Sequence, residues 1–375
     1  MTQLPSSLPN GLTEGTIAIV HYWLEEVRGG EKVFFELARA FPQADLFLLH
    51  GNLNLLPPDI AHRHVSQTFL GTKLFKRVPY RAMLPLLPLA ALSTDLRGYD
   101  LVISSSSGWS HGVRVAKGGH HVSYVHSPPR YLWGEQSPHG GRLVTTALSP
   151  LLAALRRWDV AAASRVDLFL ANSATTSERI KRSYDRESEV VYPPVDVDRF
   201  QRGSATKQEF AIAAGELVAY KRVDVAIEAC HEVGIPLVVV GDGPERRRLE
   251  QLATALRSET LFKGRVADDE FVTLLGSARL FVHAGVEDFG ITTVEALAAG
   301  TPVVGLRAGG TGEMVLPDVG ELAADGSPSS LAAAISRAID REFDRSALAA
   351  RARDFGIDAF AGHVATALGA RTKGP

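Results

Sequence analysis

Two glutamates on either side of a glycine turn have the types and spacing most suggestive of chemistry in this chain. Glu287 and Glu295 stand eight positions apart in the stretch VEDFGITTVEALAAGTPVV, residues 286–304. The pattern predicts a loop that turns at Gly290 and then a helix, whose free N–H groups and positive dipole end form a ready anion site. A polyhydroxylated ligand with an anionic centre would fit, because carboxylates accept hydrogen bonds from hydroxyls and amides bind phosphate.

A purely structural interpretation of the same pair stays open at this point. Glu295 would complement the positive end of the helix dipole, and Glu287 would be a solvated loop residue. Residue chemistry alone does not choose between a ligand site and a charge-complemented helix.

The surrounding sequence predicts the elements that position these carboxylates. Short apolar runs rich in β-branched residues, among them TIAIVHYW, DLVISSS, PLVVVGDG and RLFVHAG, alternate with stretches of helical spacing. Such alternation predicts βαβ units and parallel sheets, and it puts the loop before Gly290 at the carboxyl end of a strand, where open α/β sheets bind ligands. A polar stretch with two prolines, YPPVDVDRFQRGSATKQEF, indicates a domain boundary at about residues 195–207.

The expected fold class is therefore α/β, with two Rossmann-like, doubly wound parallel-sheet domains facing a cleft. The length of 375 residues fits two domains. We expect a disordered lead-in at residues 1–15, an N-terminal domain at 16–198, a C-terminal domain at 199–350, and a C-terminal helix at 351–375 that crosses back to the N-terminal domain.

Composition narrows the class of function. The formal net charge of −2 gives no global attraction to nucleic acid, so nucleic acid is not an expected partner. The single cysteine, Cys230, rules out an internal disulfide and fits a reducing compartment. The polar first residues lack a signal-peptide pattern, and no run approaches the roughly 20 apolar residues that span a bilayer. We expect a cytoplasmic protein.

Several further motifs accompany the glutamate pair, and together they resemble the retaining glycosyltransferases of family 4. They run from about residue 17 to about residue 325 and comprise EALAAGTPVV, AGGTGE, AAGELVAYKRVDVAIEA, VVVGDGPERRRLE, FKGRVADDEFVTLLGSARLFVHA, ANSATTSERIKRSY, VVYPPVDVDRF and YVHSPPRYLW. The resemblance implies the GT-B fold, with a nucleotide-sugar donor in the C-terminal domain and the acceptor in the N-terminal one. It implies no cofactor.

The resemblance also assigns roles to the opening stretch. Glu295 corresponds to the family glutamate that binds the ribose hydroxyls of the donor, and Glu287 to the one that holds hydroxyls of the transferred sugar. Backbone amides around Phe289, Gly290 and Ile291 would take sugar hydroxyls and phosphate.

The segment expected to bind the donor diphosphate departs from the family pattern. Lys221 matches the family lysine that pairs with the diphosphate, where negative charge builds as the glycosidic bond breaks; a solvated lysine at a helix start is the structural alternative. The family usually has an arginine directly after Gly215, whereas this chain has Glu216. Arg222 and Arg265 are the candidate substitutes.

In the N-terminal domain, His126 corresponds to the family histidine that faces the reacting sugar. The alternative is a buried, hydrogen-bonded histidine at a strand end. Gly29 and Gly30 open a predicted helix and resemble the family's first-loop glycines, which leave room for donor phosphate or acceptor.

Two motifs resemble binding motifs for a metal ion and for a dinucleotide, but neither resemblance is convincing. The DVD sequence at residues 196–198 resembles a metal-binding aspartate motif, but it lies in the interdomain segment, so we expect no metal site. The GDGPER sequence lacks the third glycine of a dinucleotide fingerprint, so NAD is not expected. By resemblance its Gly243 belongs to the donor site.

The predicted function is transfer of a sugar with retention of configuration, α-mannosyl from GDP-mannose, to a lipid-linked or oligosaccharide acceptor in polysaccharide biosynthesis. The family is usually described by front-face attack on an ion-pair-like centre. Two alternatives stay open: a UDP-sugar-dependent enzyme of the same fold, and a non-catalytic sugar-nucleotide-binding subunit, which Glu216 favours.

One segment suggests contact with a membrane surface. The stretch KLFKRVPYRAMLPLLPLAAL, residues 73–92, mixes basic residues with large apolar ones, a composition that suits anionic lipid headgroups. A proline-broken helical connection packed on the core explains the same pattern. Family members with lipid-linked acceptors often dock on the inner membrane face, so we expect peripheral association there.

Overall fold

The computed structural model describes residues 15–75, 78–133, 142–201 and 206–371 of the chain. They form two compact units: the chain up to Tyr192 together with the segment from Phe360 onward, and Pro193–Ala359. The division falls at Pro193 and not after residue 198 because the backbone of Val195 pairs with Gly356, and Val195 N–H donates to Phe355 O at 3.0 Å.

The first unit is built on a seven-stranded sheet in which every pairing is parallel. The strand order is β3-β2-β1-β5-β7-β8-β9, so the chain runs outward on one side of β1 and then outward on the other, as in a doubly wound sheet. The strands are β1 (Ile17–Leu24), β2 (Asp45–Gly51), β3 (Val65–Gln67), β5 (Leu101–Ser106), β7 (His120–Val125), β8 (Leu168–Ala171) and β9 (Glu189–Val190). A small separate sheet pairs β4 (Asp95–Leu96) with β6 (Arg114–Val115).

Both faces of this sheet are covered by helices, as strand alternation requires. Ile17 and Ile19 of β1 face a core shared with helices α1 (Gly29–Ala40) and α16 (Ile357–Arg371). Ala18 and Val20 face the opposite core. Helices of this unit are α2 (Pro58–Ala61), α3 (Tyr80–Met83), α4 (Leu87–Ser93), α5 (Arg130–Trp133), α6 (Arg142–Ala163) and α7 (Ala174–Tyr184), with short turns η1 (Leu53–Leu55), η2 (Phe69–Gly71) and η3 (Ser110–Gly112).

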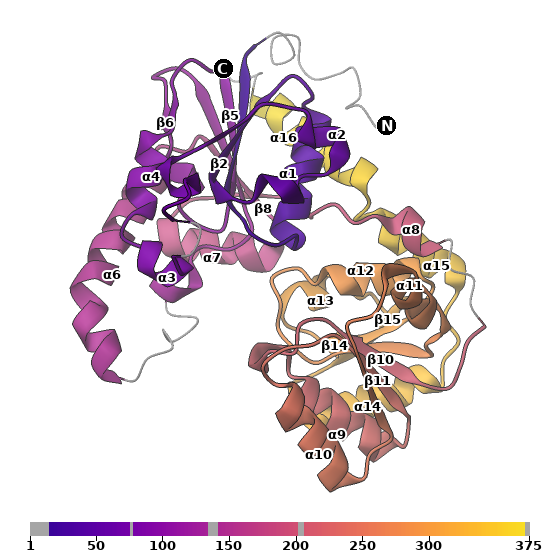
Figure 1. Cartoon of the computed structure of the whole chain (residues 1–375). Coiled ribbons are helices and arrows are strands. Elements are labelled where there is room, and N and C mark those ends of the chain that lie inside the picture. Colours follow the sequence, from indigo (N-terminus) through magenta and orange to yellow (C-terminus); the bar gives the residue numbers. More distant parts are fainter. Residues whose placement is uncertain (1–14, 76–77, 134–141, 202–205, 372–375) are drawn as a thin grey trace. The chain divides into compact units, whose positions relative to one another are not determined.

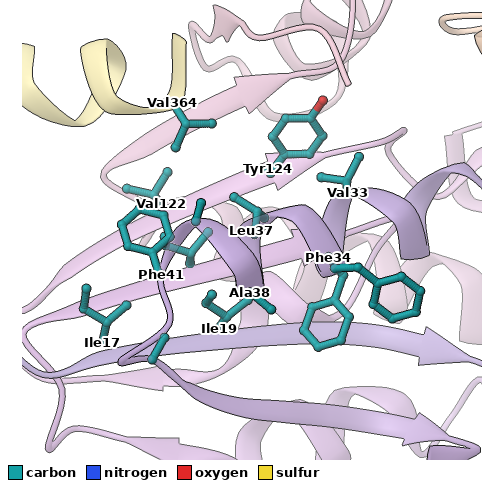
Figure 2. Close-up of a cluster of buried hydrophobic side chains, with 14 of the residues drawn as sticks. Ile17, Ile19, Val33, Phe34, Leu37, Ala38, Phe41, Val122, Tyr124 and Val364 are labelled. Atoms are coloured by element: carbon teal, nitrogen blue, oxygen red, sulfur yellow. The ribbon is translucent and has the colours of Figure 1, made fainter. Parts of the chain in front are cut away.

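The C-terminal helix α16 completes the first core although it is the last element of the chain. Phe360, Val364 and Leu368 are buried in the same cluster as the residues of α1. Figure 2 shows Val364 beside Val122 and Tyr124 of β7. The segment from Phe360 onward therefore belongs to the first unit, whereas the preceding helix α15 (Arg345–Arg353) belongs to the second.

The second unit has a six-stranded parallel sheet of order β12-β11-β10-β13-β14-β15 (Figure 1). Its strands are β10 (Ala211–Ala214), β11 (Leu237–Val240), β12 (Thr260–Gly264), β13 (Leu280–His283), β14 (Val303–Leu306) and β15 (Gly320–Ala323). Its other elements are α8 (Val197–Gln201), η4 (Ala219–Lys221), α9 (Val223–Val233), α10 (Arg246–Leu256), α11 (Asp268–Ser277), α12 (Ile291–Ala298), α13 (Gly309–Met314) and α14 (Pro328–Ile339).

Helices cover this sheet on both sides as well. Residues of α9, α10 and α14 share one apolar core with the strands. Helix α12 packs against β13 and β14 and against α8, α11, α13 and α15. The predicted α/β class with two Rossmann-like, doubly wound parallel sheets is thus confirmed. Within the described ranges, no helix is both long enough and apolar enough to cross a membrane.

Candidate functional site

The sheet of the second unit has its topological switch point between β10 and β13. From β10 the chain moves outward through β11 to β12, and it then returns to pair β13 on the other side of β10. Ligands of open α/β sheets bind in the crevice outside the carboxyl ends of the strands at such a point. Gly215 directly follows β10, and Gly285 and Glu287 closely follow β13, so the predicted residues collect where the fold places ligands.

An ion pair between Lys221 and Glu287 lies at this point. Lys221 Nζ is 2.8 Å from Glu287 Oε1, and only 15% and 18% of the two side chains are exposed. Burial works to lower the pKa of Lys221, but the negative charge and hydrogen bond of Glu287 outweigh it and raise the pKa above its usual value. The lysine is therefore an ammonium at neutral pH, held at a strand end and poorly screened by water.

Two glycines allow this lysine to lie against the strand ends. A Cβ on Gly285 would be 2.7 Å from the Cα of Lys221. A Cβ on Gly215, whose φ is +134°, would be 2.3 Å from Lys221 Nζ. Side chains at either position would push the ammonium away from the sheet. The predicted donor residue Gly215 therefore makes room for Lys221.

The loop before α12 is held by direct contact between backbones. Gly290 begins the helix with φ +91°, which favours glycine. Phe289 is buried, and its ring meets that of Phe355 edge-on at 5.7 Å. Gly310 N–H donates to Glu287 O at 2.9 Å, and a Cβ on Gly310 would come within 2.1 Å of Phe289 O. The glycines of the AGGTGE motif thus fix the loop that carries Glu287, and α12 and α13 lie side by side in Figure 1.

Glu295 lies on α12, one turn beyond Ile291, which is half-buried at the helix start. Its exposed fraction is 8%, so it is not a solvated surface carboxylate. Glu287 is not solvated either. The alternative in which Glu287 is a solvated loop residue is therefore wrong.

The loop after β11 packs against the Gly215 segment. A Cβ on Gly241 would lie 1.9 Å from Gly215 O, and one on Gly243 would lie 2.5 Å from Leu217 O. Leu217 N–H donates to Asp242 O at 2.9 Å. These contacts explain the glycines of GDGPER without a dinucleotide, and they bring the predicted residue Gly243 beside the Gly215 segment.

The charged candidates around Lys221 differ in their surroundings. Glu216 is exposed, and its charge is among those that raise the pKa of Lys221. Arg265 follows β12 and is exposed. Arg222 is exposed and lines a pocket that neither Lys221 nor Glu287 lines.

Asp196 of the DVD sequence has a structural role. Its Oδ1 accepts from Arg199 N–H at 3.2 Å in the first turn of α8. Within the described ranges, no three His, Cys, Asp or Glu side chains gather as metal ligands would.

A second group of predicted residues lies in the first unit, where β7 ends and α1 begins. His126 directly follows β7, and a Cβ on Gly30 would be 3.4 Å from its ring. Gly29 and Gly30 are the first residues of α1. The fold thus brings the predicted histidine and the predicted glycine pair together.

A hydrogen-bonded network that the sequence did not suggest orients His126. Ser105 Oγ lies 2.8 Å from His126 Nε2 and 2.9 Å from His21 Nδ1. His21 Nε2 lies 3.7 Å from Glu31 Oε1, and Glu31 Oε2 accepts from Arg28 N–H at 2.8 Å. The strand register makes the network, because β1 and β5 pair His21 directly with Ser105. The only sequence signal was a polar residue at the end of each apolar strand.

The network surrounds a neutral histidine. Burial, followed by the nearby His21, lowers the pKa of His126 to about 3. At neutral pH the ring therefore offers one donor and one acceptor, as suits a sugar hydroxyl, and it cannot act as a cation.

A buried histidine also lies beside the Lys221–Glu287 pair. His283 ends β13, stacks on Phe281 at 6.3 Å, and its exposed fraction is 7%. Burial lowers its pKa. Its Nε2 has no hydrogen-bond partner among the described residues. The sequence pattern gave no reason to single it out, since it reads as the end of an apolar strand.

The neutral histidines of the first unit make its stability depend on pH. His121 is 1% exposed, and burial lowers its pKa from 6.5 to about 3, as it does for His126. Between these values the unfolded chain binds more protons, so the free energy of unfolding falls as pH falls below 6.5, by roughly 1.4 kcal/mol per pH unit for a fully buried histidine. We expect the unfolding midpoint in urea to be clearly lower at pH 5.5 than at pH 7.5.

Tryptophan fluorescence is the measurement, because Trp23, Trp109, Trp133 and Trp158 all belong to the first unit and are the chain's only tryptophans. The variant His121→Gln should show a shallower pH dependence than the unmodified protein. Equal midpoints at the two pH values would show that these histidines titrate normally.

Comparison with known proteins agrees with this architecture. Residues 27–199 match the model described as Glycosyltransferase Family 4, and residues 195–355 match the one described as Glycosyl transferases group 1. A crystal structure of Anabaena Alr3699/HepE in complex with UDP has a TM-score of 0.68 to this chain at 21% identity, covering 95% of this chain and all of that one. The chain thus has the GT-B fold and carries two glycosyltransferase-family domains.

Curated relatives match over shorter stretches. A GDP-mannose-dependent alpha-(1-6)-phosphatidylinositol dimannoside mannosyltransferase of Mycobacterium tuberculosis is 34% identical over 148 residues, which are 38% of each chain. A 2-deoxystreptamine glucosyltransferase of Streptomyces kanamyceticus is 28% identical over 243 residues, 58% of this chain and 62% of the relative. The matched stretch spans less than two thirds of either relative.

Proposed function

We propose that this chain is a retaining glycosyltransferase that moves a sugar, α-mannosyl from GDP-mannose, to a lipid-linked or oligosaccharide acceptor in polysaccharide biosynthesis. The observation that carries the proposal is the largely buried Lys221–Glu287 pair at the switch point of the second sheet, 2.8 Å apart. A cation held at that position is suited to the charge that builds on a departing diphosphate. The two domain-family matches support glycosyl transfer in general.

The residues divide the donor between them in this proposal. Lys221 holds the diphosphate, Glu295 the ribose hydroxyls and Glu287 the transferred sugar. Amides around Phe289, Gly290 and Ile291, with the segments of Gly215 and Gly243 and the exposed Arg265, complete the donor site. In the first unit, His126 acts on the reacting sugar, and Gly29 and Gly30 leave room beside it.

Rate enhancement would come from positioning and leaving-group stabilisation. The Lys221 ammonium is already in place, so the site need not reorganise when charge develops on the diphosphate. The neutral ring of His126 is fixed by its hydrogen bond with Ser105. It would hydrogen-bond a sugar hydroxyl without itself carrying a positive charge.

Mannose and guanine are supported by the names of relatives, several of which are GDP-mannose-dependent mannosyltransferases. A UDP-sugar donor is the second candidate, since the structural neighbour Alr3699/HepE was crystallised with UDP and UDP-glucose. A thermal-shift panel of GDP, UDP, ADP and TDP tests the choice. We expect GDP to raise the melting temperature most; a larger shift with UDP would favour the second candidate, and no shift with any nucleotide would reject the donor site.

The proposed chemistry uses no metal ion, because Lys221 and the amino end of α12 take the role of a diphosphate counter-charge. We expect initial rates with excess EDTA to remain within experimental error of the untreated rates. Activity that disappears with EDTA and returns with Mg²⁺ or Mn²⁺ would contradict metal independence.

We also propose that residues 73–92 contact an anionic membrane surface. Large apolar side chains are exposed on this segment: Leu74 is 78% exposed and Leu89 56%. Lys73 is exposed as well, and so is Phe69 just before the segment, at 38%. Lys76, Arg77 and the side chain of Arg81 lie outside the described residues.

Changing Lys73, Lys76, Arg77 and Arg81 together to glutamine should greatly reduce co-sedimentation with anionic vesicles. Each basic residue near such a surface contributes about 1 kcal/mol. Activity on a short soluble acceptor should survive. Equal sedimentation of the variant and the unmodified protein would reject a basic membrane contact.

A further inference from the structure

A pocket in the second unit adjoins the Lys221–Glu287 pair, since Tyr220, Arg222 and Val286 line it. It has a volume of about 350 Å³ and is lined at the carboxyl ends of three adjacent strands by Ala284, Leu306 and Ala324. Neither Lys221 nor Glu287 lines it. Its apolar wall and its size leave room for a ligand with a carbon skeleton.

Two arginines give the pocket its charge. Arg222 and Arg307 both line it, and both are exposed. Arg307 makes no side-chain hydrogen bond or ion pair with any described residue. Arg222 uses its Nε on Asp224 at 3.2 Å, which leaves its terminal nitrogens for a ligand. Two guanidiniums at one pocket favour an oxyanion.

The pocket contains one carboxylate, which keeps its negative charge and is outnumbered by the two guanidiniums. It belongs to Asp325, whose Oδ1 accepts from Ser327 N–H at 2.9 Å and from Ser327 Oγ–H at 2.5 Å, and these bonds lower its pKa. Ser327 caps the 12-residue helix α14, so the amino end of that helix borders the pocket at Gly326. The positive end of the helix dipole adds to the two arginines.

Arg222 ends the short turn η4 in a left-handed conformation, and its N–H donates to Ala219 O. Arg222 has φ +50° and ψ +41°, a left-handed conformation that carries a steric cost for residues other than glycine. Arg257 has nearly the same conformation, φ +55°, at the carboxyl end of α10, away from the pocket, and so provides a matched control.

We propose that Arg222 and Arg307 bind the phosphate of a phosphorylated sugar in this pocket, with the sugar against the apolar wall and the half-exposed ring of Tyr220. Aromatic rings suit the apolar face of a sugar, and the pocket is larger than a phosphate alone requires. Arg222 then acts on a second ligand and not on the donor diphosphate. The site is complete within the second unit and does not depend on the proposed transfer reaction.

The test is an NMR titration of the full chain with α-glucose 1-phosphate, carried out with and without saturating GDP. We expect the amides of Ala308 and Gly326 to shift in both cases. Arg307→Gln and Arg222→Gly should each weaken binding about tenfold or more, the usual effect of losing a charged hydrogen bond. Arg257→Gly removes an arginine with the same left-handed backbone at a position away from the pocket. This variant should leave the affinity unchanged.

Other outcomes are equally informative. Glucose alone should not bind, and inorganic phosphate should bind more weakly than the sugar phosphate. Inorganic phosphate binding as tightly would overturn the sugar component of the proposal. Shifts confined to residues 215–221, or a loss of GDP affinity in Arg222→Gly without a loss of sugar-phosphate affinity, would return Arg222 to the donor site. If GDP fails to bind at all, the donor proposal fails while the pocket is still tested.

Discussion

Replacing Lys221 with methionine should lower kcat for sugar transfer by about two to three orders of magnitude. The ammonium is mostly buried and lies at the switch point of the second sheet. There it faces little competition from water, and its effect on a developing diphosphate charge is correspondingly large. Methionine keeps the length and apolar stem of the side chain and removes only the charge and its hydrogen bonds.

The control must separate catalysis from stability, because the variant leaves Glu287 partly buried without its cation. The double variant Lys221→Met with Glu287→Gln removes that charge and should recover stability but not activity. Lys263→Met, which alters a lysine paired with Glu270 in the same unit, should retain full activity. A Lys221→Met enzyme with kcat within a few-fold of normal would show that another group stabilises the leaving group.

Replacing Glu295 and Glu287 separately with glutamine should produce two different kinetic defects. Ribose contacts hardly change as the glycosidic bond breaks, so Glu295→Gln should raise the donor KM more than it lowers kcat. A hydrogen bond to a charged group contributes about 1.5–3 kcal/mol, which corresponds to a roughly tenfold or larger change in KM. Glu287 would contact the sugar that becomes cationic, so Glu287→Gln should mainly lower kcat.

Calorimetry with GDP alone distinguishes the two roles. Affinity should fall for Glu295→Gln. It should hold or rise for Glu287→Gln, since that change also releases Lys221 from its ion pair at 2.8 Å. The opposite pattern would exchange the two assignments. Unchanged kinetics in both variants would mean that the carboxylates only support the loop and helix.

The sequence predicted the fold well because its signals are local. Parallel strands buried on both faces appear as short apolar runs such as LVVV at residues 237–240, and the alternation with helices implies the sheet. The position of the glutamate loop at a strand end followed in the same way. The close backbone contacts of Gly309 and Gly310 with that loop needed coordinates, because nothing in the local pattern tells which backbone a glycine will meet.

The network around His126 was outside the reach of such patterns. His21, Ser105 and His126 are far apart in sequence, and they meet only because β1, β5 and β7 are neighbours in a particular register. The exact limits of the units were also missed, since the pairing of Val195 with Gly356 joins segments far apart in the chain. Pairings over such distances are set by topology and not by local sequence.

Transfer of radiolabelled mannose from GDP-mannose to acceptors in a lipid extract measures the proposed activity itself. We expect labelled product with the unmodified protein, in the presence of EDTA, and almost none with Lys221→Met. The same assay with UDP-glucose as donor covers the second candidate. Tight binding of GDP or UDP without transfer from either donor would rule out the proposed transferase activity and indicate a sugar-nucleotide-binding subunit.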